Sequence, residues 1–169
     1  MAMRRVYYES AVYHVMSRGN NRQAILKTSG DKVILLEIIA KYKKRYGCKI
    51  YGFVLMDNHF HLVLETNYRH NISRIMQAVL LSYSAKYRMK HNYIGYVWQG
   101  RFKSEVIDSD VYLKKCLEYI HNNPVRAQMV KRAQEYPWSS YFKYYGMKNQ
   151  NFEQRIVVDR YGDSSDGNY

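Results

Sequence analysis

The sequence contains little cysteine: Cys48 and Cys116 are the only two among 169 residues, and they lie far apart. Without a CxxC pair we do not expect a structural zinc site, because such centres need closely spaced ligands. No apolar run is long enough to span a membrane. The two arginines near the N-terminus are not followed by the apolar stretch of a secretory signal. We therefore expect a cytoplasmic protein with two reduced thiols and no membrane partner.

Acidic side chains are also scarce. The chain has 14 of them against 27 lysines and arginines, which gives a formal net charge of +13. Such an excess favours a polyanionic partner, because phosphate contacts by Lys and Arg release condensed counterions. A basic protein that carries its charge only for solubility is the alternative. The hydrophobic fraction of 47% excludes disorder throughout, and some of the 19 tyrosines could stack on unpaired bases.

The C-terminal segment differs in composition from the rest of the chain. Residues 147–169 contain three basic and four acidic side chains, and their last nine residues are polar and rich in Gly and Ser. The remaining 146 residues contain no internal repeat and no low-complexity stretch. We predict one folded domain over residues 1–146 and a polar, flexible C-terminal tail over residues 147–169.

The domain is predicted to contain seven alternating elements. Alternating apolar and polar residues predict a strand at residues 11–17, and β-rich composition predicts strands at residues 49–55 and 59–65. Residues 104–107 could form a short strand. Helical periodicity predicts helices at residues 31–46, 72–91 and 111–122. Residues 56–58 are typical of a hairpin turn, and Asp108 or Ser109 is expected to cap the last helix. The order β-α-β-β-α-β-α predicts an α+β fold of the ferredoxin-like split β-α-β type, with an antiparallel sheet and helices packed on one face.

Two histidines lie in the third predicted strand. Because successive strand side chains point to opposite faces, His59 and His61 share one face, while Phe60, Leu62 and Leu64 share the apolar other. Rings roughly 7 Å apart along a strand can tilt onto one metal ion. Two imidazoles would leave coordination positions open for substrate oxygens. The alternative is a solvated sheet face with two polar residues, since a bare HxH pattern is weak evidence.

The last predicted helix carries two stripes of side chains. The stripe expected to face the core contains Leu113, Leu117 and Ile120. A second stripe, roughly 90° away, consists of Tyr112, Cys116, Tyr119 and Asn123. If this stripe faced the histidines, a phenol could attack a phosphate while an amide oxygen completed a metal shell. The alternative is that Tyr119 packs at the core edge and Asn123 only ends the helix.

Four motifs in series resemble one protein family. In chain order they are MDNHFHL from residue 56, WQGRFK from residue 98, YIHNNPVRA from residue 119 and YPWSSY from residue 136. Each motif is weak alone, but the ordered series is specific and covers about residues 13–146. Together they resemble the repetitive-extragenic-palindrome-associated tyrosine transposases. These belong to the HUH class of single-strand nucleases, named for two histidines flanking a bulky apolar residue.

The resemblance implies a complete site on a ferredoxin-like core. The histidine pair of the family, here His59 and His61, binds a divalent ion, usually Mg²⁺ or Mn²⁺. The nucleophile lies on a late helix, here Tyr119, and a polar residue four positions later, often glutamine, contributes to the metal site. That residue is Asn123 here, and because its side chain is one methylene shorter, direct ligation stays open. Tyr112, on the same stripe, is the rival nucleophile.

The implied activity is that of a transposase: metal-dependent cutting and joining of single-stranded DNA near hairpins. The metal polarises the scissile phosphate, and Tyr119 attacks in line to form a 5′-phosphotyrosine and a free 3′-hydroxyl. Attack by another 3′-hydroxyl rejoins the strands. The phenol must lose a proton, and no general base is evident, because His121 points roughly 160° away from Tyr119 on an ideal helix. Some members of the class dimerise, so a homodimer stays open.

Basic residues in loops are candidate DNA contacts. We predict phosphate contacts by Arg18, beside a Gly-Asn loop, and by Arg101 and Lys103, just before the last strand. A single-stranded DNA carrying a hairpin would then be the partner, which implies association with the nucleoid. One alternative is a non-catalytic binder of hairpin DNA or RNA, which needs the charge and the tyrosines but not the histidine pair. A hydrolase with water as nucleophile would need His59 but not Tyr119.

Overall fold

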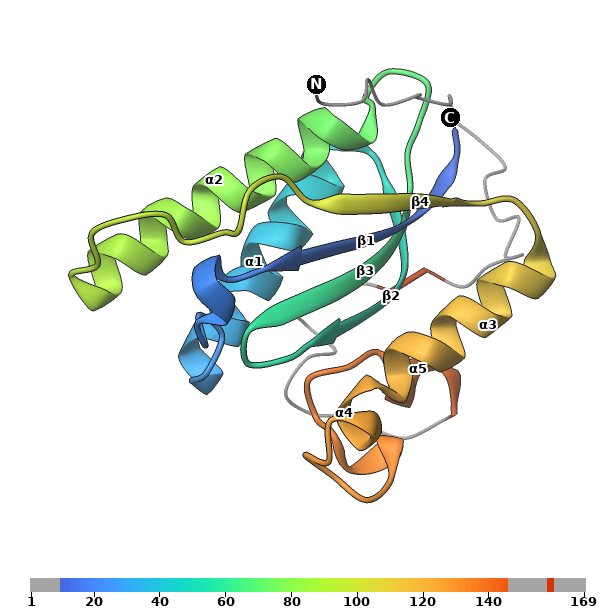
Figure 1. Cartoon of the computed structure of the whole chain (residues 1–169). Coiled ribbons are helices and arrows are strands. Elements are labelled where there is room, and N and C mark those ends of the chain that lie inside the picture. The colour runs from blue at the N-terminus through green and yellow to red at the C-terminus, as the bar shows by residue number, and fades with distance from the viewer. Residues whose placement is uncertain (1–9, 146–157, 160–169) are drawn as a thin grey trace.

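The computed structural model describes residues 10–145 and 158–159, and a four-stranded antiparallel sheet lies at its centre (Figure 1). The strands, in the spatial order β2-β3-β1-β4, are β1 (Val12–Arg18), β2 (Lys49–Leu55), β3 (His59–Glu65) and β4 (Lys103–Ile107). The long helices are α1 (Ser29–Tyr46), α2 (Ile72–His91) and α3 (Asp110–His121). The short helical segments are η1 (Asn20–Arg22), α4 (Asn123–Arg126), η2 (Ala133–Glu135) and α5 (Tyr141–Tyr144). The predicted α+β class and the order of the seven main elements are confirmed.

Capping residues set the ends of the helices. Thr28 and Asp31 form a capping box, in which each side chain accepts a hydrogen bond from the backbone N–H of the other residue. This cap starts α1 two residues earlier than the apolar periodicity predicts. Gly47 ends α1 in the left-handed conformation, with φ of 60°. Of the two caps predicted for α3, Ser109 is the one that accepts a hydrogen bond from the Tyr112 N–H.

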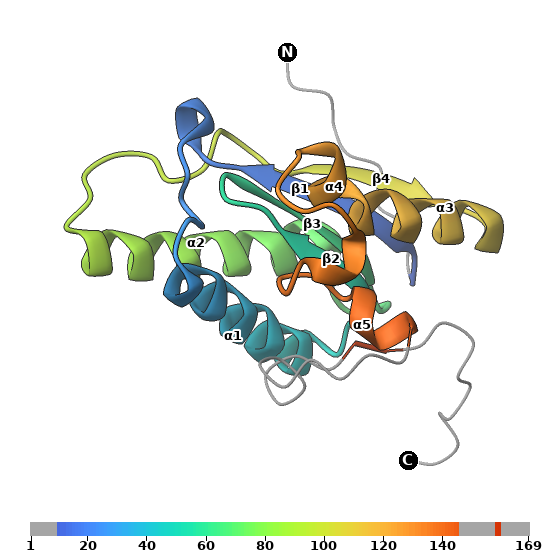
Figure 2. The same ribbon diagram turned by 90° about the horizontal axis from the view of Figure 1, so that it is seen from below.

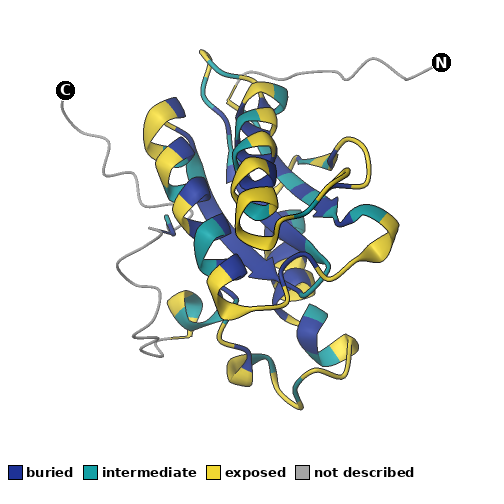
Figure 3. Cartoon of the chain, turned by 90° about the vertical axis from the view of Figure 1, so that its left-hand side faces the viewer, coloured by how far each residue is buried: buried dark blue, intermediate teal, exposed yellow. Residues whose placement is uncertain are grey.

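The two faces of the sheet are covered by different helices. α1 and α2 run side by side and pack on the face formed by alternate apolar residues, among them Val15, Phe53, Phe60 and Leu62. α3 lies apart from them (Figure 2) and packs against Tyr51, Val54, Val63 and Ile107 on the opposite face. The prediction that the helices pack on one face only is therefore corrected for α3. The reason is that the second face is apolar beyond the histidines and needs a cover of its own. The strands between the helices are largely buried (Figure 3).

A glycine lets α3 approach the sheet closely. At Gly52 of β2, a Cβ atom would lie 2.5 Å from Leu117 Cδ2 and 3.2 Å from Ile120 Cδ1. Both side chains belong to the stripe that was predicted to face the core, and both are buried. A larger residue at position 52 would therefore push α3 away from the strand.

Two later segments cover the edge of β2. The Leu55 N–H donates to the Trp138 carbonyl at 2.9 Å, and the Ser140 N–H donates to the Phe53 carbonyl at 2.9 Å. Further along, the Asp159 N–H donates to the Ile50 carbonyl at 2.7 Å. A covered edge cannot pair with a strand of another chain.

Most of the predicted tail, residues 147–169, lies outside the described residues. Of its two described residues, Val158 is buried and Asp159 forms an ion pair with Lys43 at 2.7 Å. The chain is therefore packed on β2 at this point rather than extending freely. The domain boundary at residue 146 stays a prediction.

Both cysteines are buried, and neither forms a disulfide. Burial raises the pKa of the Cys48 thiol to about 11 and that of Cys116 to about 12, so both stay protonated and unreactive near pH 7. None of the helices in the described part of the chain has the length and apolar composition needed to cross a bilayer.

The buried His121 makes the stability of the fold depend on pH. Its Nε2 lies 2.8 Å from Ser140 Oγ, and burial lowers its pKa from 6.5 to about 4. The unfolded chain therefore takes up this proton first as the pH falls. The contribution of neutral His121 to the free energy of unfolding is complete above pH 6.5. It is lost as the pH falls to about 4, and this loss amounts to about 3 kcal/mol.

We expect the free energy of unfolding, measured by urea titration, to decrease between neutral pH and pH 4. In His121→Gln, which keeps a hydrogen-bond donor for Ser140 but does not titrate, the decrease should be smaller. Equal slopes in the two proteins would contradict the assignment of this pH dependence to His121.

Candidate active site

The sheet face beneath α3 carries three histidines. His59 and His61 of β3 point to this face, whereas Phe60 points to the core under α1 and α2, as the strand pattern predicts. β1 adds His14, whose Nε2 lies 2.8 Å from His61 Nδ1, with the two rings stacked at 5.1 Å between centroids. The His59 and His61 rings lie 5.2 Å apart, nearly at right angles. Three imidazoles therefore form a continuous cluster.

His14 was not identified from the sequence. Strand alternation places it on the face of β1 opposite to Tyr13 and Val15, among the partly buried residues of the strand. Its proximity to His61 depends on the antiparallel register of β1 and β3, in which His14 pairs with Val63. A pattern within one strand does not contain this information.

The hydrogen bonds around the rings orient them in the same way. His59 Nδ1 lies 2.6 Å from Asn58 Oδ1, and the Asn58 amide group donates to the Arg22 carbonyl at 3.3 Å. A carbonyl oxygen only accepts, so His59 Nδ1 carries the proton and Nε2 keeps its lone pair. His61 Nδ1 is engaged by His14, and Nε2 of His61 has the free lone pair in the tautomer in which Nδ1 donates to His14. Metal-binding histidines are commonly held in this way by an outer partner.

The imidazoles are neutral near pH 7. Burial, assisted by the nearby Arg18 guanidinium, lowers the pKa of His59 to about 4, although the Asn123 side chain opposes the shift. Burial, with the other two histidines and Arg18, lowers the pKa of His61 to about 3. Burial also lowers the pKa of His14, although Glu105 opposes the shift. A neutral imidazole is the form that binds a metal ion.

Tyr119 faces this cluster from α3. The centre of its ring lies 5.8 Å from that of His61 and 6.1 Å from that of His14, and 42% of the residue is exposed. The Arg126 guanidinium of α4 lies 5.0 Å from the centre of the same ring. Arg126 lies within one of the recognised motifs, but no role was predicted for it.

The Asn123 side chain lies beside His59. Its Nδ2 is buried and has no hydrogen-bond partner among the described residues. A buried polar group without a partner is costly, so the site has unused capacity for a polar ligand. Imidazole nitrogens and the Asn123 amide oxygen can ligate a divalent ion, and the free Nδ2 can donate a hydrogen bond to a phosphate oxygen bound beside it.

The rival nucleophile Tyr112 has a different environment. Its hydroxyl donates to Glu105 Oε2 at 3.2 Å, and burial together with this carboxylate raises its pKa. Tyr112 and Tyr119 both line a cavity of about 470 Å³ that also contains His14 and His61. Of the two phenols, Tyr119 is the one in ring contact with the histidines.

The three predicted DNA contacts lie in two places. Arg18 ends β1 opposite His59, and its buried Nε has no partner among the described residues. Lys103 lines the cavity that contains Tyr119, as does Lys115 of α3, which the sequence did not single out. Arg101 lies two residues before Lys103 but lines another cavity, next to α2.

Comparisons with known proteins concern the fold and the family of the chain. A sequence model of the family described as "Transposase IS200 like" matches residues 7–123. The solved structure of a "REP associates tyrosine transposase bound to a REP hairpin" superposes with a TM-score of 0.73 at 20% identity, covering 99% of this chain and 94% of that one. A putative transposase from Deinococcus radiodurans superposes with a TM-score of 0.51 at 18% identity, covering 72% and 97% of the two chains. Comparison with functionally characterised protein sequences found no match.

The two structural similarities show the shared fold, and the sequence match shows the family. The match extends from before β1 to Asn123 and so includes His14, the His59–His61 pair and Tyr119. The chain therefore belongs to the family of IS200-like transposases.

Proposed function

We propose that the protein is a metal-dependent endonuclease and strand transferase that cuts single-stranded DNA near hairpins through a covalent bond to Tyr119. The observation that carries this proposal is the contact of the Tyr119 ring with two hydrogen-bonded histidines, at 5.8 and 6.1 Å. A phenol at this position can attack a phosphorus atom bound over the histidines. The net charge of +13 suits a DNA partner, and one structurally similar transposase is described as bound to a DNA hairpin.

The residues fit a site for Mg²⁺ or Mn²⁺. His59 and His61 would hold the ion through Nε2, and Asn123 would contribute its amide, either directly or through a water molecule. A bound ion would neutralise charge that develops on the scissile phosphate. His14 is a positioning residue in this arrangement, because its hydrogen bond to His61 Nδ1 fixes the ring orientation.

Cations around the phenol would hold the substrate phosphate. Arg126 lies over the Tyr119 ring, while Lys103 and Lys115 line the same cavity as the phenol. Guanidinium and ammonium groups stabilise the charge of phosphate oxygens during transfer. His121 does not serve as the base, because it lies on the buried side of α3 and is bonded to Ser140.

In the reaction, the Tyr119 oxygen forms a bond to phosphorus as the bond to the 3′-oxygen breaks. The strand on one side of the cut stays attached to the protein as a 5′-phosphotyrosine, and the other ends in a 3′-hydroxyl. Attack of a 3′-hydroxyl on the phosphotyrosine would release the tyrosine and join the strands.

The homodimer that the family resemblance leaves open stays a prediction.

A simple binder of hairpin DNA or RNA would not need buried neutral histidines facing a half-exposed tyrosine. Covalent chemistry is therefore the discriminating observable. We expect a labelled DNA hairpin with single-stranded arms to form a covalent adduct with the wild-type protein in Mg²⁺ or Mn²⁺, detected on a denaturing gel. Tyr119→Phe should lose the adduct, because it lacks the attacking oxygen, whereas the matched variant Tyr112→Phe should keep it.

Two outcomes would contradict the assignment. An unchanged adduct in Tyr119→Phe would exclude this nucleophile. DNA cleavage without an adduct, surviving the loss of Tyr119 but not of His59, would instead indicate a hydrolase that uses water.

Metal binding can be measured apart from cleavage. We expect His61→Ala to abolish Mn²⁺ binding in isothermal titration calorimetry. His14→Phe, which keeps an aromatic ring but loses the hydrogen bond, should weaken binding by about 10–100-fold. The control is His70→Phe, because His70 packs against Tyr46, away from the site. Equal Mn²⁺ affinities in the wild type and His14→Phe would show that His14 does not position the ligand.

A further inference from the structure

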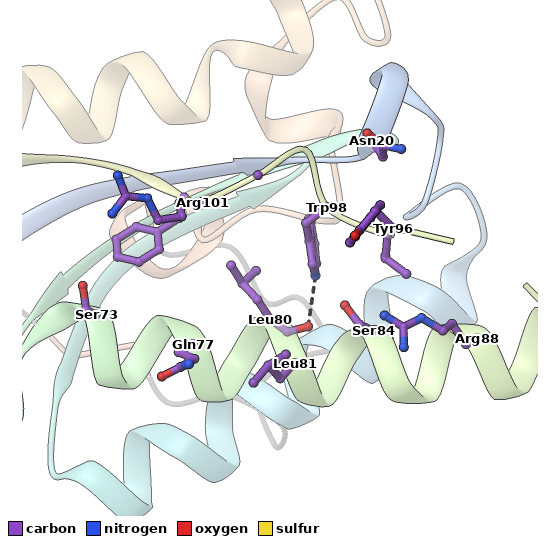
Figure 4. Close-up of a pocket in the computed structure, with 13 residues that line it drawn as sticks. Asn20, Ser73, Gln77, Leu80, Leu81, Ser84, Arg88, Tyr96, Trp98 and Arg101 are labelled. Carbon is purple, nitrogen blue, oxygen red and sulfur yellow. Dashed lines mark hydrogen bonds between the residues drawn. The ribbon is translucent and has the colours of Figure 1, made fainter. Parts of the chain in front are cut away.

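A second cavity, of about 760 Å³, lies between α2 and the segment that leads into β4 (Figure 4). Its volume falls in the range of pockets that bind small molecules, about 300–1,000 Å³. One wall is a stripe of α2 side chains spaced three or four residues apart, which includes Gln77, Leu81 and Arg88. The other wall is formed by Tyr96, Trp98 and Arg101, and neither wall belongs to the site around Tyr119.

The inner part of this cavity is aromatic and apolar. Trp98 is buried, and its indole N–H donates to the Leu80 carbonyl at 3.0 Å (Figure 4). Its ring packs against Phe60 at 5.5 Å and Tyr83 at 5.3 Å. A preformed aromatic wall costs little ordering on binding, which favours a flat apolar ligand.

The rim is exposed and apolar. Tyr96 is 79% exposed and Leu81 is 62% exposed, and both line the cavity. Exposed apolar surface around a pocket is typical of a binding site. An exposed tyrosine offers a face on which any nucleobase can stack.

The charges at the cavity are positive. Figure 4 shows Arg101 at one end and Arg88, near Tyr96, at the other. Neither guanidinium forms an ion pair within the described part of the chain, and the described lining contains no acidic side chain. The side-chain amides of Gln77 and Asn20 supply donors and acceptors. A ligand with an aromatic face, hydrogen-bonding edges and an anionic group matches this set, and a nucleotide has all three.

The segment that leads into β4 runs from this cavity towards the site around Tyr119. Arg101 lines one cavity and Lys103, two residues later, lines the other. The Gln99 N–H donates to the Arg18 carbonyl at 2.8 Å, next to the histidine cluster. A single DNA strand that follows this segment would therefore meet both cavities.

We propose that this cavity binds one unpaired nucleotide of the strand that is cut at Tyr119. Its base stacks on Tyr96 against the Trp98 wall, Gln77 and Asn20 contact the base edge, and Arg88 or Arg101 holds a phosphate. Binding there fixes the distance between the recognised nucleotide and the scissile phosphate. The inference rests on the proposed function for the identity of the strand, but binding can be measured without cleavage.

The test uses the full chain and a labelled DNA hairpin with a single-stranded arm on each side, in EDTA to prevent cleavage. Each arm nucleotide in turn is replaced by an abasic site, and affinity is measured by fluorescence anisotropy. In the wild type we expect one position at which base loss weakens binding by about tenfold, as expected when one stacked base is removed. In Tyr96→Ala the intact DNA should bind about tenfold more weakly, and loss of that base should have no further effect.

Matched variants separate this outcome from a general loss of binding. Ile94→Ala changes a 95% exposed neighbour that does not line the cavity and should behave as the wild type. When each of the four bases is placed at the sensitive position in turn, the differences in DNA affinity between them should be smaller in Gln77→Ala than in the wild type. Base loss that costs the same in the wild type and in Tyr96→Ala at every position would overturn the proposal, as would the absence of hairpin binding.

The two proposals fail in different ways. If Tyr119 adducts form on the same DNA while the abasic scan shows no position coupled to Tyr96, the cavity proposal fails and the proposed function stands. If the scan identifies the position but no adduct forms in Mg²⁺ or Mn²⁺, the nucleotide site stands and the cleavage chemistry fails.

Discussion

The close packing of α3 against β2 is the contact on which the site depends. Leu117 and Ile120 lie so near Gly52 that a Cβ atom there would be 2.5 Å from the leucine side chain. Tyr119 lies between these two residues in the sequence and points to the histidines instead of the core. Core packing on one side of the helix therefore determines the position of the phenol on the other. Repacking at residue 52 would move the nucleophile even though it changes no residue of the cluster.

Burial of the histidines links the stability of the protein to its chemistry. The same desolvation that lowers the pKa values of His59 and His61 keeps their rings neutral, with lone pairs available near pH 7. Acidic conditions would therefore weaken both the fold and the proposed metal site, because protonation of these rings favours the unfolded chain and competes with the ion. The positive charge of Arg18 acts in the same direction on both rings. A basic site of this kind is suited to an anionic substrate, which would offset the mutual repulsion of its cations.

The sequence predicts the parts of the site that lie within one element. Alternation in β3 gives the shared face of His59 and His61, and helical spacing gives the stripe that contains Tyr119. Contacts between elements were not predictable in this way. His14 reaches His61 only through the register of β1 on β3, and Arg126 reaches Tyr119 because α4 begins directly after α3. The placement of α3 opposite α1 and α2 follows from apolar residues on the second sheet face, which the histidine pattern obscured. The backbone contact of Asp159 with Ile50 joins residues far apart in the chain, and no local pattern indicates it.

The identity of the tyrosine that bonds to DNA is the central claim, and peptide mapping of the adduct tests it most directly. Trypsin separates the two candidate tyrosines, because Lys114 and Lys115 lie between Tyr112 and Tyr119. After nuclease trimming of the bound DNA, mass spectrometry should find a 5′-phosphate-linked nucleotide on the peptide of residues 116–126, in which Tyr119 is the only tyrosine. A nucleotide on the peptide of residues 104–114, which contains Tyr112, would contradict the account.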